Sequence, residues 1–409
     1  MITLDDIRAR DAADPLAQFR DRFDLPEGVN YLDGNSLGPL PKSTLPRMHS
    51  VLSEEWGRDL ITSWNRHDWI GFPRRLGAKI SQLIGAKPEE VLAVDTASIN
   101  IFKLLSAAIQ LNPGRRTILS ESGNFPTDVY MIEGLASVTG GQVEQKLVEP
   151  EEIEAALNED VAVLLLPHTH YKSGRVHDMQ RITEKAQAVG ALVIWDLCHT
   201  VGALPVDLNA SHADFAVGCG YKYLNGGPGA PAFLFCAERH QDKVFPVLSG
   251  WLGHSKPFDF VDEFQPAPGI QRFQCSSPSI LGLAALECGV DITIEAGMEA
   301  LREKSITLCE LFITLVESRT TGFTLASPRD ATVRGSQISF AHEHGYPIMQ
   351  ALISRGVIGD FRAPNLLRFG FTPLYVRYED VWNAVDVLVD IMATQAWDTP
   401  EFHARAAVT

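Results

Sequence analysis

The 409-residue chain lacks the features that would mark several other classes of protein. Its six cysteines, at positions 198, 219, 236, 275, 288 and 309, include no CxxC pair, so we expect reduced thiols and no disulfide framework or zinc site. His168 and His170 resemble a metal pair only weakly and have no evident third ligand, so no metal is expected. No apolar run approaches the length of a bilayer span, and no basic segment followed by an apolar one opens the chain. We therefore expect a cytoplasmic protein without a membrane partner.

Positive charge is also scarce, because 35 Lys and Arg residues face 51 Asp and Glu residues and leave a net charge of -16. That balance argues against nucleic acid as a partner. The GxxxxGK[ST] and GxGxxG patterns are absent, and the glycine-rich segment 225–229 precedes a strand, so nucleotide binding loses its usual signatures. Contents of 45% hydrophobic and 21% charged residues describe an ordinary globular chain, long enough for one large and one smaller domain.

Short buried runs alternate with helical patterns through the middle of the chain. The runs lie at 91–94, 117–120, 161–166, 191–195, 214–218 and 230–235. This alternation predicts an α/β fold with a mainly parallel sheet. The C-terminal third, with helices at about 279–317, 346–355 and 378–394 and strands at 336–340 and 366–370, predicts a smaller α+β domain. We expect residues 46–285 to form the large domain, and residues 1–45 with 286–409 to form the small one.

Asp196 and Lys222 follow two consecutive buried runs. Both would therefore lie at the carboxyl edge of the sheet, where ligands bind in open α/β folds. A lysine in low dielectric loses proton affinity, and an uncharged amine can add to an aldehyde. With a carboxylate to keep a pyridine nitrogen protonated, the pair supplies what pyridoxal 5'-phosphate requires. Alternatively, Asp196 caps a helix beginning near Thr200, and Lys222 is a solvated residue in a glycine turn.

Two helix starts carry further candidate ligand contacts. The strand at 91–94 leads through Thr96 and Ser98 into a helix whose positive end favours a phosphate, and a plain N-cap by either residue is compatible with that role. At the next helix, Phe125 could stack on a flat ring while Asp128 reaches polar atoms of the same ligand. The alternative for this segment is an ordinary helix opening.

Substrate contacts are predicted from three other places. Asn35 and Ser36 occupy a loop of glycines and prolines, where they face a ligand or simply form a turn. Trp64 lines an aromatic pocket or holds two helices together. Arg368 lies within an apolar strand and must meet an anion, which is either a substrate carboxylate or the partner of a structural salt bridge. From the sequence alone, the salt bridge is the favoured reading.

Six segments occur in an order that resembles a known family. They are Tyr31–Gly38, Asn124–Asp128, Trp195–His199, Gly220–Gly229, Trp251–His254 and Ser276–Ile280. Over nearly its whole length the chain resembles the kynureninases of bacterial type, which are pyridoxal-phosphate hydrolases of the aspartate-aminotransferase fold (fold type I). The resemblance implies a large domain of the pyridoxal-phosphate-dependent transferase type, with a sheet of the seven-stranded kind, beside the smaller α+β domain.

The resemblance also implies roles for individual residues. Lys222 would bind the cofactor as a Schiff base, Asp196 would pair with the pyridine nitrogen, and Phe125 would stack on the ring. Further cofactor contacts would come from Ala97, Ser98, Asp128, His199, Tyr221, Trp251 and Ser277. Part of this set would come from the neighbouring subunit, so a homodimer with shared active sites is implied. Ser277 departs from the asparagine that related enzymes can carry, which weakens its implied phosphate contact.

The implied reaction is hydrolytic Cβ–Cγ cleavage of L-kynurenine, and more slowly of 3-hydroxykynurenine, to anthranilate and L-alanine in tryptophan catabolism. Lys222 would remove the α-proton, Arg368 would take the α-carboxylate, and Tyr221 would transfer later protons or only anchor the phosphate. A cysteine desulfurase would need a nucleophilic cysteine on a mobile loop, and the segment 318–365 contains none. A noncatalytic, cofactor-binding regulator has no need to keep Lys222, Asp196 and Arg368 together.

Overall fold

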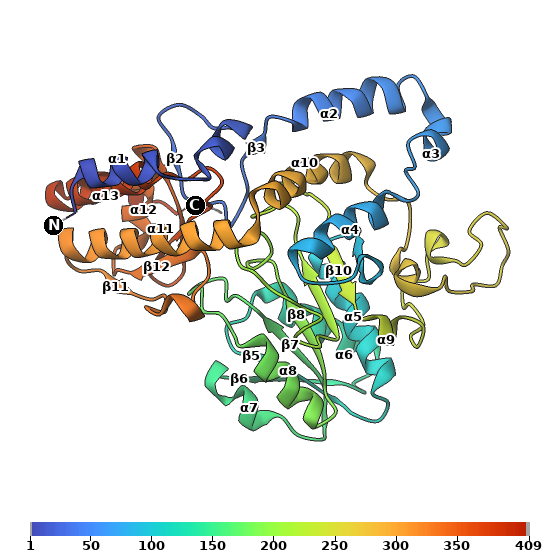
Figure 1. Ribbon diagram of the computed structural model, residues 1–409. Helices are drawn as coiled ribbons and strands as arrows, with labels where there is room; N and C mark the ends of the chain where they lie inside the picture. Colours follow the sequence, from blue (N-terminus) through green and yellow to red (C-terminus); the bar gives the residue numbers. More distant parts are fainter. Residues whose placement is uncertain (1, 406–409) are drawn as a thin grey trace.

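The computed structural model describes residues 2–405 and is built around a seven-stranded sheet (Figure 1). The spatial order of the strands is β4-β10-β9-β8-β7-β5-β6. Their bounds are β4 Val91–Ala93, β5 Thr117–Glu121, β6 Glu144–Val148, β7 Val161–Pro167, β8 Leu192–Asp196, β9 Phe215–Gly218 and β10 Phe233–Cys236. β10 runs antiparallel to β4 and β9, whereas the remaining pairs are parallel. The predicted α/β fold with a mainly parallel sheet is confirmed.

Successive residues of the central strands pack on opposite faces of this sheet, as the two-residue period of a strand requires. In β7, Leu164 and Leu166 join the core beneath α4 (Phe72–Leu83), while Val163 and Leu165 join the core beneath α5 (Ala97–Leu111). Helices α6 (Pro126–Val138) and α8 (Met179–Ala188) complete the two layers. Because both faces are covered, these strands read in the sequence as continuous apolar runs.

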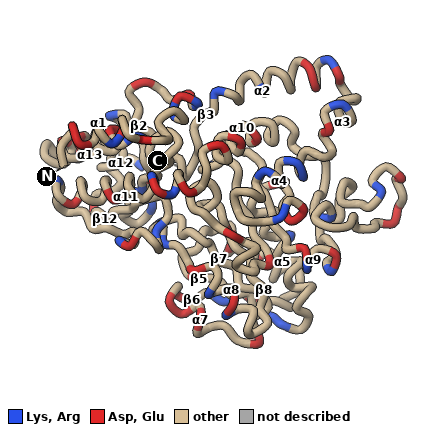
Figure 2. Tube along the Cα trace, viewed as in Figure 1, with Lys and Arg blue, Asp and Glu red and all other residues tan. Residues whose placement is uncertain are grey.

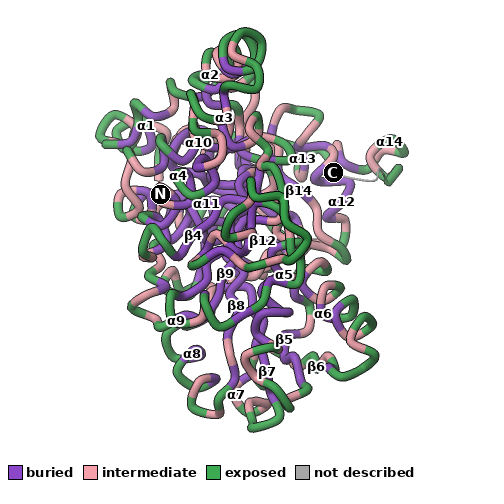
Figure 3. Tube along the Cα trace, turned by 90° about the vertical axis from the view of Figure 1, so that its right-hand side faces the viewer, coloured by how far each residue is buried: buried purple, intermediate pink, exposed green. Residues whose placement is uncertain are grey.

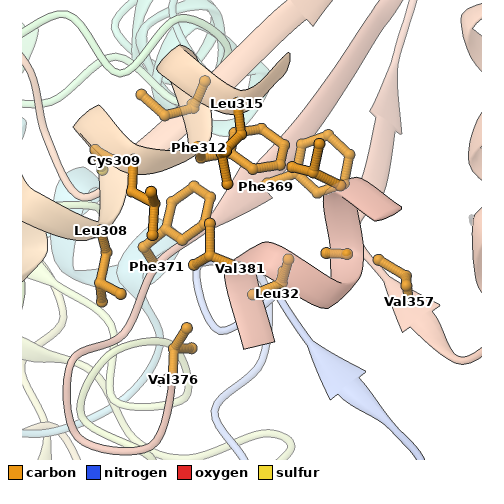
Figure 4. Packing of buried hydrophobic residues seen from close by; sticks show 14 of the residues in the cluster. Leu32, Leu308, Cys309, Phe312, Leu315, Val357, Phe369, Phe371, Val376 and Val381 are labelled. Atoms are coloured by element: carbon orange, nitrogen blue, oxygen red, sulfur yellow. The ribbon is translucent and has the colours of Figure 1, made fainter. Parts of the chain in front are cut away.

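The small sheet is antiparallel, in the order β11-β12-β15-β14. Its strands are β11 Thr324–Leu325, β12 Gln337–Ala341, β14 Asp360–Arg362 and β15 Leu366–Gly370. Helices α1 (Leu4–Ala12), α11 (Met298–Arg319), α12 (Gly345–Ser354) and α13 (Tyr378–Thr394) pack around it, and β2 (Asn30–Tyr31) pairs with β13 (Val357–Ile358). In the core, the Phe312 ring lies 4.9 Å from that of Phe369 and 5.1 Å from that of Phe371 (Figure 4).

Helix α10 (Ile280–Ala296) connects the two parts of the molecule. Leu283 and Leu286 pack in the core of the large sheet, and Ile292 packs with the N-terminal segment and the C-terminal third. The predicted boundary at residue 285 therefore lies within a continuous helix. The division of the chain into two domains stays a prediction.

Two segments extend from the body and expose apolar side chains. The first runs from α2 (Thr44–Ser50) to α3 (Ser63–Arg66), and the second is the loop 245–264 (Figures 1 and 3). Their exposed large residues include Leu45, Trp56, Ile61, Phe245, Trp251, Phe258 and Phe260. Acidic and basic residues are interspersed over the outer helices and loops (Figure 2). Within residues 2–405, no helix has the length and apolarity needed to cross a membrane.

Candidate active site

One cleft at the carboxyl edge of the large sheet brings eight of the predicted site residues together. They are Ala97, Ser98, Phe125, Asp128, Asp196, His199, Tyr221 and Lys222. Asp196 ends β8, Lys222 follows β9, and Ala97 and Ser98 open α5. Tyr171, from the loop after β7, lines the same cleft. The lysine and the carboxylate therefore lie at the predicted edge of the sheet.

Lys222 is buried, with only 8% of its surface exposed. Its Nζ lies 2.9 Å from His199 Nε2 and 5.7 Å from the ring centroids of Phe125 and Tyr221. Among the described residues, none of the salt bridges involves this lysine. The alternative of a solvated lysine in a turn is therefore wrong. The amine faces an aromatic cleft and forms no salt bridge with a described carboxylate.

Asp196 does not cap a helix. Its Oδ1 accepts a 2.7 Å hydrogen bond from the Cys198 amide, which closes a tight turn directly after β8, and the chain continues in turns through Thr200. The capping alternative is therefore wrong. Because one carboxylate oxygen is fixed by the backbone, the group is held at the sheet edge while its other oxygen is available to a ligand.

Burial and the charge of Asp196 together raise the pKa of Asp128 well above its usual value. Its Oδ2 is buried and has no hydrogen-bond partner among residues 2–405. A buried polar atom without a partner is costly, so this oxygen is matched to a group that the protein itself does not supply. Burial, followed by the Lys222 charge, lowers the pKa of His199 well below its usual range, so its imidazole is neutral.

The N-terminus of α5 also lines the cleft. Thr96 is the N-cap and accepts a hydrogen bond from the Ile99 amide at 3.4 Å. The amides of Ala97 and Ser98 belong to the first turn, whose N–H groups have no acceptor within the helix. With the helix dipole they favour an anion. Phe125, which is 41% exposed, meets Tyr171 edge-on at 5.2 Å and leaves a ring face open to the cleft.

Arg368, by contrast, is already paired. Its Nε donates to Asp360 Oδ1 at 2.8 Å, its Nη2 bonds both Asp360 Oδ2 and Ser36 Oγ, and its Nη1 donates to the Tyr171 carbonyl at 2.6 Å. The side chain is 1% exposed. The structural salt bridge that the sequence favoured is present. Contact between Arg368 and a substrate carboxylate stays a prediction, as it does for Asn35 and Ser36, which lie in the same network.

The carboxylates of Asp33 and Asp360, which lie in this network, have pKa values shifted in opposite directions. Burial, followed by the charge of Asp360, raises the pKa of Asp33 to about 7. For Asp360, burial opposes ionisation, but the charge of Arg368 and its hydrogen bonds lower the pKa. Asp360 is therefore the ionised partner of Arg368, while Asp33 is poised to be protonated near neutral pH.

This difference predicts a pH-dependent stability. Between its unfolded pKa and about 7, Asp33 keeps a proton when folded that it loses on unfolding, so its contribution to stability falls as pH rises. Asp33→Asn removes that titration. Relative to the wild type, the variant should gain up to about 1.4 kcal/mol per unit between about pH 5 and pH 7, and no more above that. Denaturant unfolding of both proteins across this range measures the difference, and a constant difference would contradict the prediction.

Besides Asn35, Ser36 and Arg368, three more predicted residues do not line the cleft. Trp64 packs edge-on against Trp69 at 5.8 Å, Trp251 is 43% exposed beside Phe258, and Ser277 is exposed. Conversely, Gln337 and Asp360 contact the site residues but were not predicted from the sequence. For Gln337 the available signal was a polar residue at the start of a largely apolar strand, similar to the signal that marked Arg368. Asp360, in the strand sequence Asp-Phe-Arg, carried no such signal.

The residues of the cleft fit pyridoxal 5'-phosphate. The amine of Lys222 matches its aldehyde, the free oxygen of Asp196 matches its pyridine nitrogen, and the start of α5 matches its phosphate. Phe125 offers a ring face. The unpaired oxygen of Asp128 provides a further polar contact.

The fold is shared with known enzymes of this kind. A cysteine desulfurase from Thermococcus onnurineus superposes with a TM-score of 0.78 at 17% identity, covering 92% of this chain and 98% of that one. With the cleft, this fold defines a pyridoxal-phosphate enzyme of fold type I. The family model for the kynureninase C-terminal domain matches residues 301–388. Kynureninases from Burkholderia mallei and Pseudomonas fluorescens are 50% and 48% identical over the full length of both chains. The chain belongs to the kynureninase family.

Proposed function

We propose that this protein hydrolyses the Cβ–Cγ bond of L-kynurenine, giving anthranilate and L-alanine, and cleaves 3-hydroxykynurenine more slowly. It would act in the cytoplasm, in tryptophan catabolism. The observation that carries the proposal is the pairing of Lys222 with Asp196 in one cleft of a chain that is about half identical to kynureninases over its full length. The balance is one kynurenine and one water for one anthranilate and one alanine.

When bound, pyridoxal phosphate supplies a sink for the electrons released at the substrate's α-carbon. Lys222 would hold the cofactor and would take the substrate's α-proton on Nζ. Asp196 would keep the pyridine nitrogen protonated through its free oxygen, and the amides of Ala97 and Ser98 would hold the phosphate. Phe125 would cover one ring face and exclude water from it.

Tyr221 is assigned the later proton transfers. Burial raises the pKa of its hydroxyl, so the group remains protonated at neutral pH and acts as a donor before it can act as a base. It would protonate the three-carbon fragment before alanine leaves. A hydroxyl that only anchors the phosphate is the alternative, and Tyr221→Phe distinguishes the two by lowering either kcat or cofactor affinity.

A homodimer accounts for the predicted residues that stand apart from the cleft. Trp251, Ser277 and Trp64 lie on exposed segments, two of which carry several exposed apolar side chains. We propose that a second copy brings Trp251 and Ser277 to the phosphate end of the cleft. Sedimentation equilibrium, and complementation in mixed dimers of Lys222→Ala and Trp251→Ala chains, test this arrangement.

Turnover decides the function. Purified protein loaded with the cofactor should release fluorescent anthranilate from L-kynurenine, and should process 3-hydroxykynurenine with a lower kcat/KM. L-cysteine serves as the comparison substrate, because the fold is shared with cysteine desulfurases. Sulfide from cysteine without anthranilate from kynurenine would overturn the proposal.

Asp196→Asn should keep the cofactor bound but weaken its capacity to accept the electrons released at the substrate's α-carbon. The change removes the charge opposite the pyridine nitrogen while nearly conserving volume, and loss of one such electrostatic partner costs about 100- to 1,000-fold in kcat. Asp214→Asn is the matched control. Asp214 is a buried carboxylate that directly precedes the first residue of β9, whereas Lys222 follows the last, and it is bonded to Arg239 and His240. It should lower the melting temperature only. Near-normal turnover of Asp196→Asn would remove Asp196 from this role.

A further inference from the structure

Gln337 connects the small sheet to the lysine of the cleft. It opens β12 and its side chain is fully buried. Its Nε2 donates to the Tyr171 carbonyl at 2.8 Å, and its Oε1 lies 3.0 Å from His199 Nδ1. His199 in turn lies 2.9 Å from Lys222 through Nε2. Gln337, more than one hundred residues from Lys222 in the sequence, is thus linked to its amine through the imidazole of His199.

The contacts of Gln337 determine which ring nitrogen of His199 carries the proton. The amide NH2 must face Tyr171, because a carbonyl oxygen there would oppose Oε1. Oε1 therefore faces His199 and can only accept, so Nδ1 carries the hydrogen. Because the imidazole is neutral, Nε2 is left with a lone pair. Lys222 must then donate to it.

The direction of that last hydrogen bond matters for a lysine that acts as a base. A neutral amine has two hydrogens and one lone pair. Donating a hydrogen to Nε2 keeps the lone pair for the substrate's α-proton and orients it. With the other tautomer, Nε2–H would donate to the amine and occupy the lone pair itself.

We propose that Gln337 is a positioning residue of the α-proton transfer: it holds the proton of His199 on Nδ1 and thereby leaves the lone pair of Lys222 free. This inference rests on the proposed function for the role of Lys222 as a base. It concerns residues of this chain alone, so the ring state of His199 can be measured without any substrate.

The first test is the tautomer in the wild-type protein. With histidine labelled by 15N and the His199 signals identified by their loss in His199→Asn, Nδ1 should show a protonated and Nε2 an unprotonated nitrogen. In Gln337→Met, which keeps the length of the side chain and removes both polar groups, this single tautomer should be lost. A wild-type ring protonated on Nε2 overturns the proposal whether or not any variant folds.

The second test is the exchange of the α-hydrogen of L-alanine with solvent deuterium in the cofactor-loaded enzyme. Gln337→Met should slow this exchange by about 100-fold, as misplacement of a reacting group does. The matched control is Ser339→Ala. Ser339 is a buried residue of the same strand that donates to the carbonyl of Lys172, next to Tyr171, and the bonds of its side chain do not involve His199.

Ser339→Ala removes a comparable contact between the two parts and should leave both the exchange rate and the tautomer unchanged. Equal exchange in Gln337→Met and wild type, or equal slowing by both variants, overturns the proposal. Because alanine exchange needs no kynurenine, a protein that exchanges alanine but fails to cleave kynurenine contradicts the proposed function and leaves the role of Gln337 standing.

Discussion

Lys222→Ala should reduce kynurenine turnover by about 10,000-fold or more, because it removes both the covalent attachment of the cofactor and the base for the α-proton. The buried position of Nζ, within 2.9 Å of His199 and facing Phe125, leaves no other described amine as close to this centre of the cleft. In the wild type, borohydride reduction and peptide mapping should locate the cofactor on Lys222. In the variant, the cofactor should remain dialysable after reduction.

Lys172→Ala is the matched control for this prediction. Lys172 follows the cleft residue Tyr171, with its Nζ 5.6 Å from that ring, and it has no assigned part in the reaction. Its replacement should preserve both the covalent label and turnover. A label that maps to Lys172, or to any lysine other than Lys222, would refute the assignment.

Arg368→Ala should reduce both stability and kcat/KM. Removing one partner of a buried ion pair destabilises by about 3–5 kcal/mol, because Asp360 is left buried without its main counter-charge. If Arg368 also binds the substrate's α-carboxylate, kcat/KM should fall by a further factor equivalent to about 2–5 kcal/mol. Lysine should restore little, since it cannot reproduce the planar fork on Asp360.

The double variant Arg368→Ala/Asp360→Ala separates these two effects. Removing both charges should restore much of the melting temperature, because no unpaired carboxylate remains. A substrate contact predicts that kcat/KM stays low in the double variant. If kcat/KM recovers together with the melting temperature, Arg368 is structural only, and the carboxylate role is refuted.

The central part of the site could be read from the sequence because strand ends are local features. An apolar run that ends in Asp196 or leads to Lys222 fixes both residues at the same sheet edge, whatever the rest of the chain does. The same runs predicted the core of the large sheet. Strand β6 was missed because it is an edge strand with the polar sequence Glu-Gln-Lys, which carries no apolar pattern.

Contacts that depend on the packing of the fold could not be predicted in the same way. The position of Arg368 in an apolar strand predicted an anionic partner but did not identify it. The partner is Asp360 because β14 pairs with β15 in a register that places the two residues opposite each other. Likewise, the neutral state of His199 and the positions of Trp64 and Trp251 outside the cleft follow from burial and packing, which the spacing of residues in the sequence does not determine.

The sequence by itself determined the α/β fold, the lysine and carboxylate at the sheet edge, and the helix start that suits a phosphate, because each of these follows from hydrophobic periodicity and the polar residue that interrupts it. Only the tertiary structure decided that Arg368 is held by Asp360 and that Gln337 reaches Lys222 through His199. Gln337 and His199 are more than one hundred positions apart and belong to the two different parts of the molecule, whereas Asp360 and Arg368 meet only through the pairing of β14 with β15. In both cases the hydrogen bonds depend on which atoms the fold brings within about 3 Å.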